Sequence, residues 1–575
     1  MKSYTFRGIG ASDFSGVSVS SAGNVDGDGR DDFIIGARSA DVNSASGAGQ
    51  IYLISGADLA ALDIANGNPA DGVIELSDVA ATGASYQFNG IHAFDEAGHS
   101  VSSAGDVDGD GKDDFIIGAP KADPNGSISG EIYLISGADL AALDAASAGT
   151  PGVIELSDLA ATGNSYQFIG ADRGDWAGYS ISSAGDVDKD GKDDFIIGAP
   201  RADPNGTTSG SVYLISGADL VALDLASGAD GVIELSDVAA GSKSYQFNGV
   251  SAGDEAGSSI SSLRDVDGDG HDDLIIGAID ADPNGNSSGE IYFISGIDLA
   301  ALDRASGVDG VIDLSDVAGT GGSYQFNGIA LGDNAGSSVS SAGDVDGDGK
   351  DDLIIGAAMG QSNGVDSGEI YLISGKDFAD LDFASGMDGV IELSDVAAVR
   401  GSYQFVGASA NDQAGFAISS AGDVDNDGKD DLIIAAVTAD PNGSTNAGET
   451  YIIAAADLAD LDAASGTNGV IELSDVAATM TGNSYQFSGS NAMDNAGYSV
   501  SSAGDVDGDG KGDFIIGAPR ADPNGNASGE TYFISGADLA DLDARSGADG
   551  VIELIHAICF ARGTLIQTQL GEVPI

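Results

Sequence analysis

Short apolar runs recur along the whole chain, separated by segments rich in Gly, Asp, Asn and Pro. The run Phe-Ile-Ile at 115–117 has no polar alternation, as expected for a strand that is buried on both faces. Later runs are short and rich in β-branched or aromatic residues, which predicts further strands. These runs lie at 131–136, 153–156 and 165–168. The chain is therefore predicted to be all-β, with one short helix at 138–144 on a connection.

An acidic segment, Asp-Val-Asp-Gly-Asp-Gly-Lys-Asp-Asp at 106–114, precedes this run and recurs along the chain. Seven copies begin at residues 24, 106, 186, 265, 344, 423 and 505, a period of 79 to 82 residues. Periods of about this size indicate solenoids, propellers or arrays. About four strands per repeat, seven times, favour a seven-bladed β-propeller over residues 1–555. The small residues at 98–105 would then form the innermost strand, beside a central channel.

The two ends of this array predict how the ring closes. Ser-Tyr-Thr-Phe at 3–6 matches Ser-Tyr-Gln-Phe at 165–168, an element that precedes each new loop but is missing after Leu554. The N-terminal strand is therefore predicted to complete the seventh blade, so that no sheet edge stays open.

The acidic segment places carboxylates where a hard cation would need them. Asp106, Asp108, Asp110 and Asp114 occupy loop positions 1, 3, 5 and 9, and Gly111 at position 6 allows a sharp turn. Such an oxygen-rich loop suits a cation that takes six to eight oxygen ligands. No His or Cys takes part, which favours Ca²⁺ over Zn²⁺.

Two other interpretations of the segment were weighed. An EF-hand would carry a bidentate Glu at position 12 and continue as a helix, whereas position 12 here is Ile117 in a strand-like run. An Asp-Gly-rich hairpin turn without metal is the second alternative. The sevenfold recurrence favours the metal over the plain turn.

Charge narrows the possible partners and activities. The chain has 92 acidic and 21 basic residues, and its formal net charge of −71 argues against nucleic acid or an anionic membrane surface as a partner. His92, His99 and His271 are scattered, and no catalytic set repeats or clusters in the propeller. The sequence therefore predicts a binding protein, with up to seven Ca²⁺ ions, that is monomeric.

Signals for location point in two directions. No apolar run approaches the roughly 18–20 residues of a membrane span. The start at 1–7 has no apolar signal core, so an N-terminal signal peptide is not recognisable. Seven calcium loops nevertheless predict an extracellular or cell-surface location.

The loop and the Phe-Ile-Ile-Gly-Ala-Pro that follows it resemble the FG-GAP repeat of integrin α-subunits and of many bacterial secreted and surface proteins. The resemblance covers residues 1–554 and implies a calcium ion between the first and second strands of each blade. Asn24 replaces one charged ligand, which predicts that the first site is the weakest. The ligands implied are Asn24, Asp26, Asp28 and Asp32; Asp106, Asp108, Asp110 and Asp114; Asp186, Asp188, Asp190 and Asp194; Asp265, Asp267, Asp269 and Asp273; Asp344, Asp346, Asp348 and Asp352; Asp423, Asp425, Asp427 and Asp431; and Asp505, Asp507, Asp509 and Asp513.

Two further motifs lie outside the calcium loops. Asp-Pro-Asn-Gly at 123–126 recurs in four other repeats and is typical of a turn, with a binding loop as the alternative. These loops are the first candidate surface for an unidentified glycan or protein ligand at a cell surface. Arg-Gly-Asp at 173–175, the tripeptide that integrins recognise, is interpreted as a variant of the repeat.

The last residues, 556–575, depart from the repeat. Cys559, the only Cys, opens a Cys-Phe-x-x-Gly-Thr segment that resembles the start of a Hint domain, the self-processing module of hedgehog proteins and inteins. That resemblance implies that Cys559 attacks the preceding carbonyl to form a thioester. The downstream part of such a domain does not follow, so Cys559 is expected to be inactive in this chain.

Together these patterns predict a secreted or cell-surface calcium-binding propeller that acts as an adhesion or binding module, attached to an incomplete Hint domain. The alternative is a self-processing precursor in which a complete Hint domain cleaves before Cys559 and releases the propeller.

Overall fold

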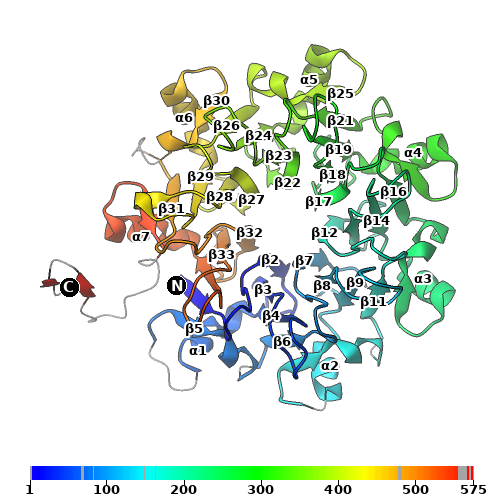
Figure 1. The fold of residues 1–575 in the computed structure, drawn as a ribbon, viewed down its shortest axis with the longest axis horizontal. Coiled ribbons are helices and arrows are strands. Elements are labelled where there is room, and N and C mark those ends of the chain that lie inside the picture. Colours follow the sequence, from blue (N-terminus) through cyan, green and yellow to red (C-terminus); the bar gives the residue numbers. More distant parts are fainter. Residues whose placement is uncertain are drawn as a thin grey trace.

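Seven five-stranded sheets surround a central axis in the computed structural model, so the chain is a seven-bladed β-propeller as predicted (Figure 1). The structure describes residues 3–65, 70–81, 83–147, 149–161, 163–476 and 482–554, together with the backbone of Ile566–Thr568 and Gly571–Val573. Short helices lie at the outer rim of the ring (Figure 1).

Each blade uses equivalent elements. The innermost strands are β2 (Ser18–Gly23), β7 (Ser100–Gly105), β12 (Ser180–Gly185), β17 (Ala256–Ser262), β22 (Ala335–Gly343), β27 (Ala414–Gly422) and β32 (Ser499–Gly504). The second strands are β3 (Asp32–Ala37), β8 (Asp114–Ala119), β13 (Asp194–Ala199), β18 (Leu274–Ala278), β23 (Asp352–Ala357), β28 (Asp431–Ala436) and β33 (Asp513–Ala518). The third strands are β4 (Gln50–Ile54), β9 (Glu131–Ile135), β14 (Ser211–Ile215), β19 (Glu290–Ile294), β24 (Glu369–Ile373), β29 (Glu449–Ile453) and β34 (Glu530–Ile534).

The outer elements are shorter. The fourth strands are β6 (Tyr86–Asn89), β11 (Tyr166–Ile169), β16 (Tyr245–Asn248), β21 (Tyr324–Asn327), β26 (Tyr403–Val406), β31 (Tyr485–Ser488) and β1 (Tyr4–Arg7). The fifth strands are β10 (Val153–Glu155), β15 (Val232–Glu234), β20 (Val311–Asp313), β25 (Val390–Glu392), β30 (Val470–Glu472), β35 (Val551–Glu553) and β5 (Val73–Glu75). The helices are α1 (Leu59–Leu62), α2 (Leu140–Ala146), α3 (Leu220–Ser227), α4 (Leu299–Ser306), α5 (Phe378–Ser385), α6 (Leu458–Ser465) and α7 (Leu539–Ser546).

The fifth strand links neighbouring blades. The chain leaves the second blade after β9, passes through α2 and adds β10 to the outer edge of the first blade, parallel to β6. It then returns to form β11 in its own blade. Each blade therefore has one strand more than the four or so that were predicted, because this edge strand belongs in sequence to the following repeat.

The N-terminal strand completes the last blade, as predicted. β1 pairs antiparallel with β34, with Tyr4 opposite Phe533 and Arg7 opposite Glu530. The same strand pairs in parallel with β5 on its other side. Residues more than 500 positions apart in the sequence thus share one sheet.

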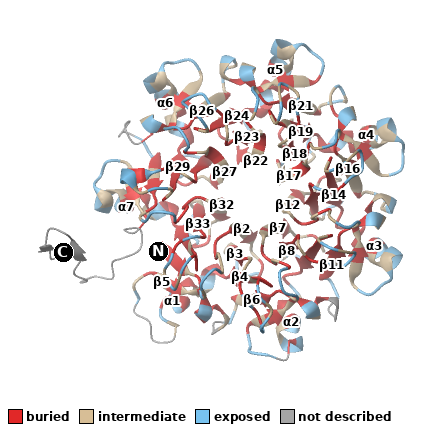
Figure 2. Cartoon of the chain, in the orientation of Figure 1, coloured by how far each residue is buried: buried red, intermediate tan, exposed pale blue. Residues whose placement is uncertain are grey.

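The hydrophobic core lies between blades. Phe115 and Ile117 of β8 are buried against the first blade, whereas Ile116 between them is buried against the third. This explains why the run has no polar alternation: both faces of the strand are covered. Phe88 of the first blade meets Phe115 edge to face, with ring centroids 5.4 Å apart. Burial is concentrated in the strands, while the peripheral helices expose one face (Figure 2).

Candidate metal centre

The loop at 106–114 joins β7 to β8 and folds back on itself. Gly109 and Gly111 have φ values of 79° and 91°, in the left-handed region that glycine enters without steric cost. The Asp106 carboxylate accepts hydrogen bonds from the N–H groups of Gly109 at 2.8 Å and Gly111 at 2.9 Å. The turn predicted at position 6 thus brings position 1 over the loop. We number the loops 1 to 7 in chain order and call the face of the ring that carries them the carboxylate face.

Most loops bring three of their predicted ligands together. Carboxylate oxygens of Asp106, Asp108 and Asp114 all lie within 4.8 Å of one another. Without a cation, such a group holds like charges close together, which is unfavourable. Equivalent sets in loops 3 to 6 are Asp186, Asp188 and Asp194; Asp265, Asp267 and Asp269; Asp344, Asp346 and Asp348; and Asp423, Asp425 and Asp431.

The fourth predicted ligand differs between loops. In loops 4 and 5 the convergent set includes position 5, whereas Asp273 and Asp352 at position 9 are not part of it. Loops 1 and 7 fold back in the same way, since Asn24 Oδ1 accepts the N–H of Gly29 at 3.3 Å and Asp505 Oδ2 accepts that of Gly510 at 2.9 Å. The longer bond is in loop 1, where an amide replaces the carboxylate.

The aspartate at position 9 is buried in every predicted set. Asp114 is 1% exposed, and its two oxygens accept the N–H groups of Val107 and Gly137, each at 3.0 Å. Burial raises the pKa of Asp114 to about 7 and that of Asp194 to about 8. A cation beside these groups would favour their charged forms and offset this cost.

Three features show that the loops fit a cation. Asp265 Oδ1 at position 1 of loop 4 is buried without a hydrogen-bond partner. In loop 3, Lys243 Nζ lies 3.0 Å from Asp188 Oδ1 and 3.0 Å from Asp190 Oδ2. In loop 5, the Lys376 ammonium contacts Asp346 and lies 3.5 Å from Asp348 Oδ2. The donor set is all oxygen, which suits Ca²⁺ or Mg²⁺.

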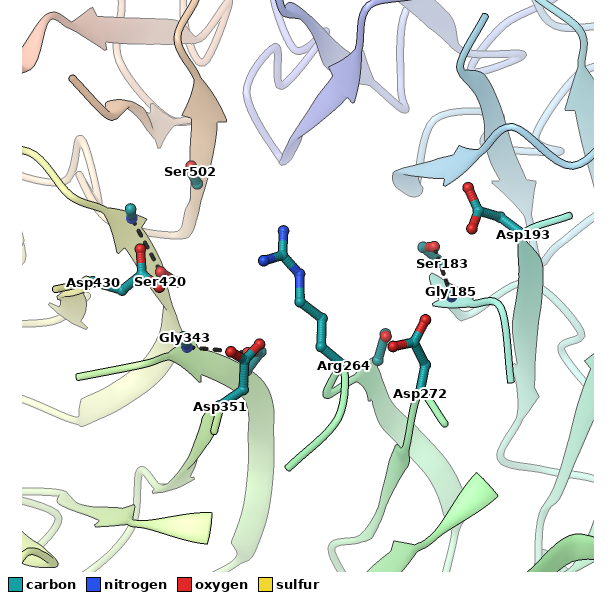
Figure 3. Close-up of a pocket in the computed structure, with 13 residues that line it drawn as sticks. Ser183, Gly185, Asp193, Arg264, Asp272, Gly343, Asp351, Ser420, Asp430 and Ser502 are labelled. Atoms are coloured by element: carbon teal, nitrogen blue, oxygen red, sulfur yellow. Dashed lines mark hydrogen bonds between the residues drawn. The ribbon is translucent and has the colours of Figure 1, made fainter. Parts of the chain in front are cut away.

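The central channel carries a second set of carboxylates that the sequence analysis missed. In most loops an aspartate at position 8 bonds to the start of the preceding loop: Asp193 accepts the N–H of Asp106 at 2.7 Å, and Asp272 that of Asp186 at 2.8 Å. With Asp351 and Asp430 they line a cavity of about 500 Å³ at the axis (Figure 3). Recurrence of Asp at position 8 in six repeats was the available signal.

Arg264 is a strong departure from the repeat in this channel. It stands where other repeats carry Gly, has a φ of 35°, and extends its guanidinium toward the channel axis (Figure 3). Burial raises the pKa of Asp351 to about 6, and the charge of Arg264 opposes that rise.

The opposite face of the ring uses its polar residues internally. Asn125, in the Asp-Pro-Asn-Gly loop between β8 and β9, donates to Gly170 O at 2.9 Å and to Glu234 at 2.6 Å. Equivalent bonds join Asn284 to Glu392 and Asn524 to Glu75. The turn interpretation therefore fits these asparagines, each of which ties its loop to the edge strand that another repeat adds to the same blade.

The Arg-Gly-Asp tripeptide lies on the same opposite face. Asp175 is 6% exposed, and its carboxylate accepts the N–H of Asp172 at 2.9 Å. Asp95 and Asp333 in other repeats make the same contact within their own loops. Asp175 is therefore part of the repeat, as the sequence indicated.

An aromatic cluster near this face was also missed. Trp176 stacks on Tyr179 with centroids 5.9 Å apart, and the Arg201 guanidinium lies 3.7 Å from the centre of the Trp176 ring. His99 packs on Tyr179 at 5.1 Å. Nothing in the sequence indicated the contacts of His99 with Tyr179 and of Trp176 with Arg201, because these partners come from other segments of the chain.

Comparison with known proteins agrees with this geometry. The FG-GAP repeat model matches the chain seven times, at residues 15–54, 97–135, 177–215, 256–294, 335–373, 414–453 and 496–534. Each match begins at or just before an innermost strand and ends with the third strand of the same blade. These matches support an integrin-type β-propeller.

Several curated relatives are integrin α chains. Integrin alpha-5 of Xenopus laevis is 29% identical over 277 residues, which cover 48% of this chain and 20% of the relative. Integrin alpha pat-2 of Caenorhabditis elegans is 31% identical over 191 residues, covering 32% and 13%. Integrin alpha-V of Gallus gallus is 27% identical over 265 residues, covering 46% and 20%. The chain thus spans a fifth or less of the length of these relatives.

Two expectations remain, one on membrane spans and one on the segment of Cys559. Among the described residues, no helix is long and apolar enough to cross a membrane. Cys559 lies outside the described residues, so its predicted role as a Hint nucleophile stays a prediction. Beyond it, β36 (Ile566–Thr568) and β37 (Gly571–Val573) pair antiparallel.

Proposed function

We propose that the chain is a calcium-binding adhesion or binding module that acts outside the cell or at its surface. The observation that carries the proposal is the convergence of carboxylates such as Asp106, Asp108 and Asp114 in loops that repeat around one face of the ring. Calcium would hold each loop in its folded form and so stabilise the junction of the first two strands. The integrin α relatives support a role in adhesion.

We place the partner on the face opposite the carboxylate loops. Phe94 is 68% exposed and Leu331 64% exposed, both in loops that lead into an innermost strand. Phe94 N–H donates to Ser46 O in the neighbouring loop, which fixes the segment that carries this side chain. Exposed apolar groups on rigid loops are typical of contact surfaces. A glycan or protein at a cell surface is the proposed partner.

The experiment is binding of the labelled chain to cells and to a broad glycan and matrix-protein panel, with calcium and after chelation. Binding that needs calcium and falls in a Phe94→Ser, Leu331→Ser double variant supports the proposal. The matched control is Val221→Ser, Leu225→Ser, which removes two equally exposed apolar groups from α3. Absence of binding across the panel, or equal loss in both double variants, would contradict it.

A self-processing precursor is the second candidate, and it depends on the Cys559 segment alone. The intact mass of the product from its native source tests it. A species that ends at Ile558 supports cleavage before Cys559, and an uncleaved product throughout contradicts it.

A further inference from the structure

Lysine ammonium groups occupy two of the seven loops. Lys243 Nζ bridges position 3 and position 5 of loop 3, with 3.0 Å to Asp188 Oδ1 and 3.0 Å to Asp190 Oδ2. Lys376 bridges the same two positions of loop 5, Asp346 and Asp348. Both lysines thus engage oxygens that calcium would also need.

The other loops show different neighbours at these places. Asn164 stands at the repeat position of Lys243, immediately before the Ser-Tyr-Gln-Phe strand, and its amide donates to Asp108 Oδ2 of loop 2 at 2.9 Å. Asn483 does the same to Asp425 Oδ2 of loop 6 at 2.7 Å. An amide can turn its oxygen toward a cation, whereas an ammonium has only donors. At the repeat position of Lys376, five repeats carry Ala.

Loops 1, 2, 4 and 6 have no such competitor in the part of the chain that the structure describes. The ligand carboxylates of loop 1 accept bonds from backbone N–H groups and from Ser55, and those of loop 4 from backbone N–H groups and Ser295. Lys2, at the repeat position of Lys243 in the last blade, lies outside the described residues. Loop 7 is therefore left out of the comparison.

We propose that Lys243 and Lys376 are built-in competitors of the cation, so that loops 3 and 5 bind calcium more weakly than loops 2 and 6. The inference rests on the proposed calcium binding. Calcium must displace the ammonium before it can take the oxygens at positions 3 and 5, and the displaced positive charge stays close to the ion. In the metal-free protein the same ammonium neutralises the clustered carboxylates and holds the loop folded. Each lysine therefore weakens calcium binding and stabilises the metal-free form.

The lysine thus lowers calcium affinity and raises the stability of the metal-free form. A lysine with a merely structural role would raise stability without lowering calcium affinity, so measuring both quantities separates the two roles. Lys243→Asn installs the residue that loop 2 uses, and Lys376→Ala installs the residue of five other repeats. Each variant is expected to bind calcium about three- to thirtyfold more tightly at its loop, from two ion pairs of ordinary strength. Each variant is also expected to melt at a lower temperature than wild type in chelator.

The experiment is a calcium titration of the chelator-treated full chain by calorimetry, with native mass spectrometry to count ions, and melting in chelator. Lys121→Ala is the control, since Lys121 is 41% exposed and paired with Glu96 away from the loops, against 37% and 43% for Lys243 and Lys376. The control should leave calcium binding unchanged.

A reverse variant covers the case in which the lysine variants fold poorly. Asn164→Lys should weaken the site in loop 2 by a similar factor and raise melting in chelator. Calcium binding that is unchanged or weaker in the Lys243 and Lys376 variants, and unchanged in Asn164→Lys, would overturn the inference while leaving the proposed function intact. If no chain binds calcium at all, the calcium assignment itself fails, and the inference fails with it.

Discussion

The two faces of the propeller are both rich in acidic residues, yet they use them differently. On the carboxylate face, Asp106 and Asp108 converge on each other and on a buried Asp114. On the opposite face, Glu234 accepts an amide from Asn125, and Asp175 accepts a backbone N–H within its own loop. Repetition of acidic residues therefore does not by itself indicate a metal site. The proposed calcium binding rests instead on the convergence of carboxylates on one another.

The largest expected effect is the removal of calcium from the whole ring. A site that binds only the folded form contributes about 2.7 kcal/mol when calcium is at 100 times its dissociation constant. Chelation should therefore lower the melting temperature strongly and cooperatively, and added calcium should restore it. If the melting temperature is the same with chelator and with calcium, the carboxylate face does not bind calcium, and the two faces do not differ in this respect. Chelator already saturated with calcium is the control.

The next test weakens calcium binding at a single loop. Asp108→Asn keeps the shape of the side chain but removes one ligand charge from loop 2. It should cost the calcium contribution of that loop, up to about 2.7 kcal/mol at the same saturation, and nothing comparable in chelator. Asp123→Asn on the opposite face is the matched control, since its oxygen accepts only the Ile128 N–H. If both variants lose the stabilisation by calcium equally, the loss comes from the change in net charge and not from the removal of a ligand.

The amide contacts of the opposite face should behave in the other way. Asn125→Ala leaves Glu234 and Gly170 O without a donor, which costs about 1–3 kcal/mol. Because no cation is involved, denaturant unfolding should show the same loss with calcium and with chelator. A loss that appears only with calcium would mean that the two faces are coupled. Glu234→Gln, which keeps an acceptor oxygen, should lose less.

The last effect concerns pH. Burial raises the pKa of Asp333 to about 6, above its ordinary value of 3.8. The folded state therefore holds the proton more tightly, so this contribution is complete below about pH 4 and is lost as pH rises through 6. In chelator, Asp333→Asn should flatten the fall of stability between pH 4 and 6 by at most about 1.4 kcal/mol per pH unit. An identical slope in variant and wild type would show that Asp333 titrates normally in the fold.

Much of the fold could be predicted because it depends on patterns within one repeat. The unalternating Phe-Ile-Ile run indicated a strand covered on both sides, and Ser3–Phe6 matched the missing fourth strand of the last blade. The ligand aspartates of the loop at 106–114 were predicted from their spacing, and those of the other loops from the resemblance to the FG-GAP repeat. The short Val153–Glu155 run was recognised as a strand, but its parallel pairing with the preceding blade was not, since three residues give no signal of their partner.

Most of the features that were missed join residues far apart in the sequence. Lys243 contacts Asp188, 55 positions earlier, and Asn125 contacts Glu234, 109 positions later. Arg264 lines the same cavity as the channel aspartates only because the ring brings them to one axis (Figure 3). Their signal in the sequence was indirect: each is a repeated or a conspicuously altered position, and only the closed arrangement of blades shows what it faces.

The most direct test of the account is a crystal structure of the chain grown with millimolar calcium. We predict one ion in each loop, bound by oxygens of the loop aspartates at about 2.3–2.6 Å. In loops 3 and 5, we expect the ammonium groups of Lys243 and Lys376 to have moved away from the ion. Loops that stay without an ion at this concentration, with their carboxylates bonded only to the protein or to water, would contradict the account.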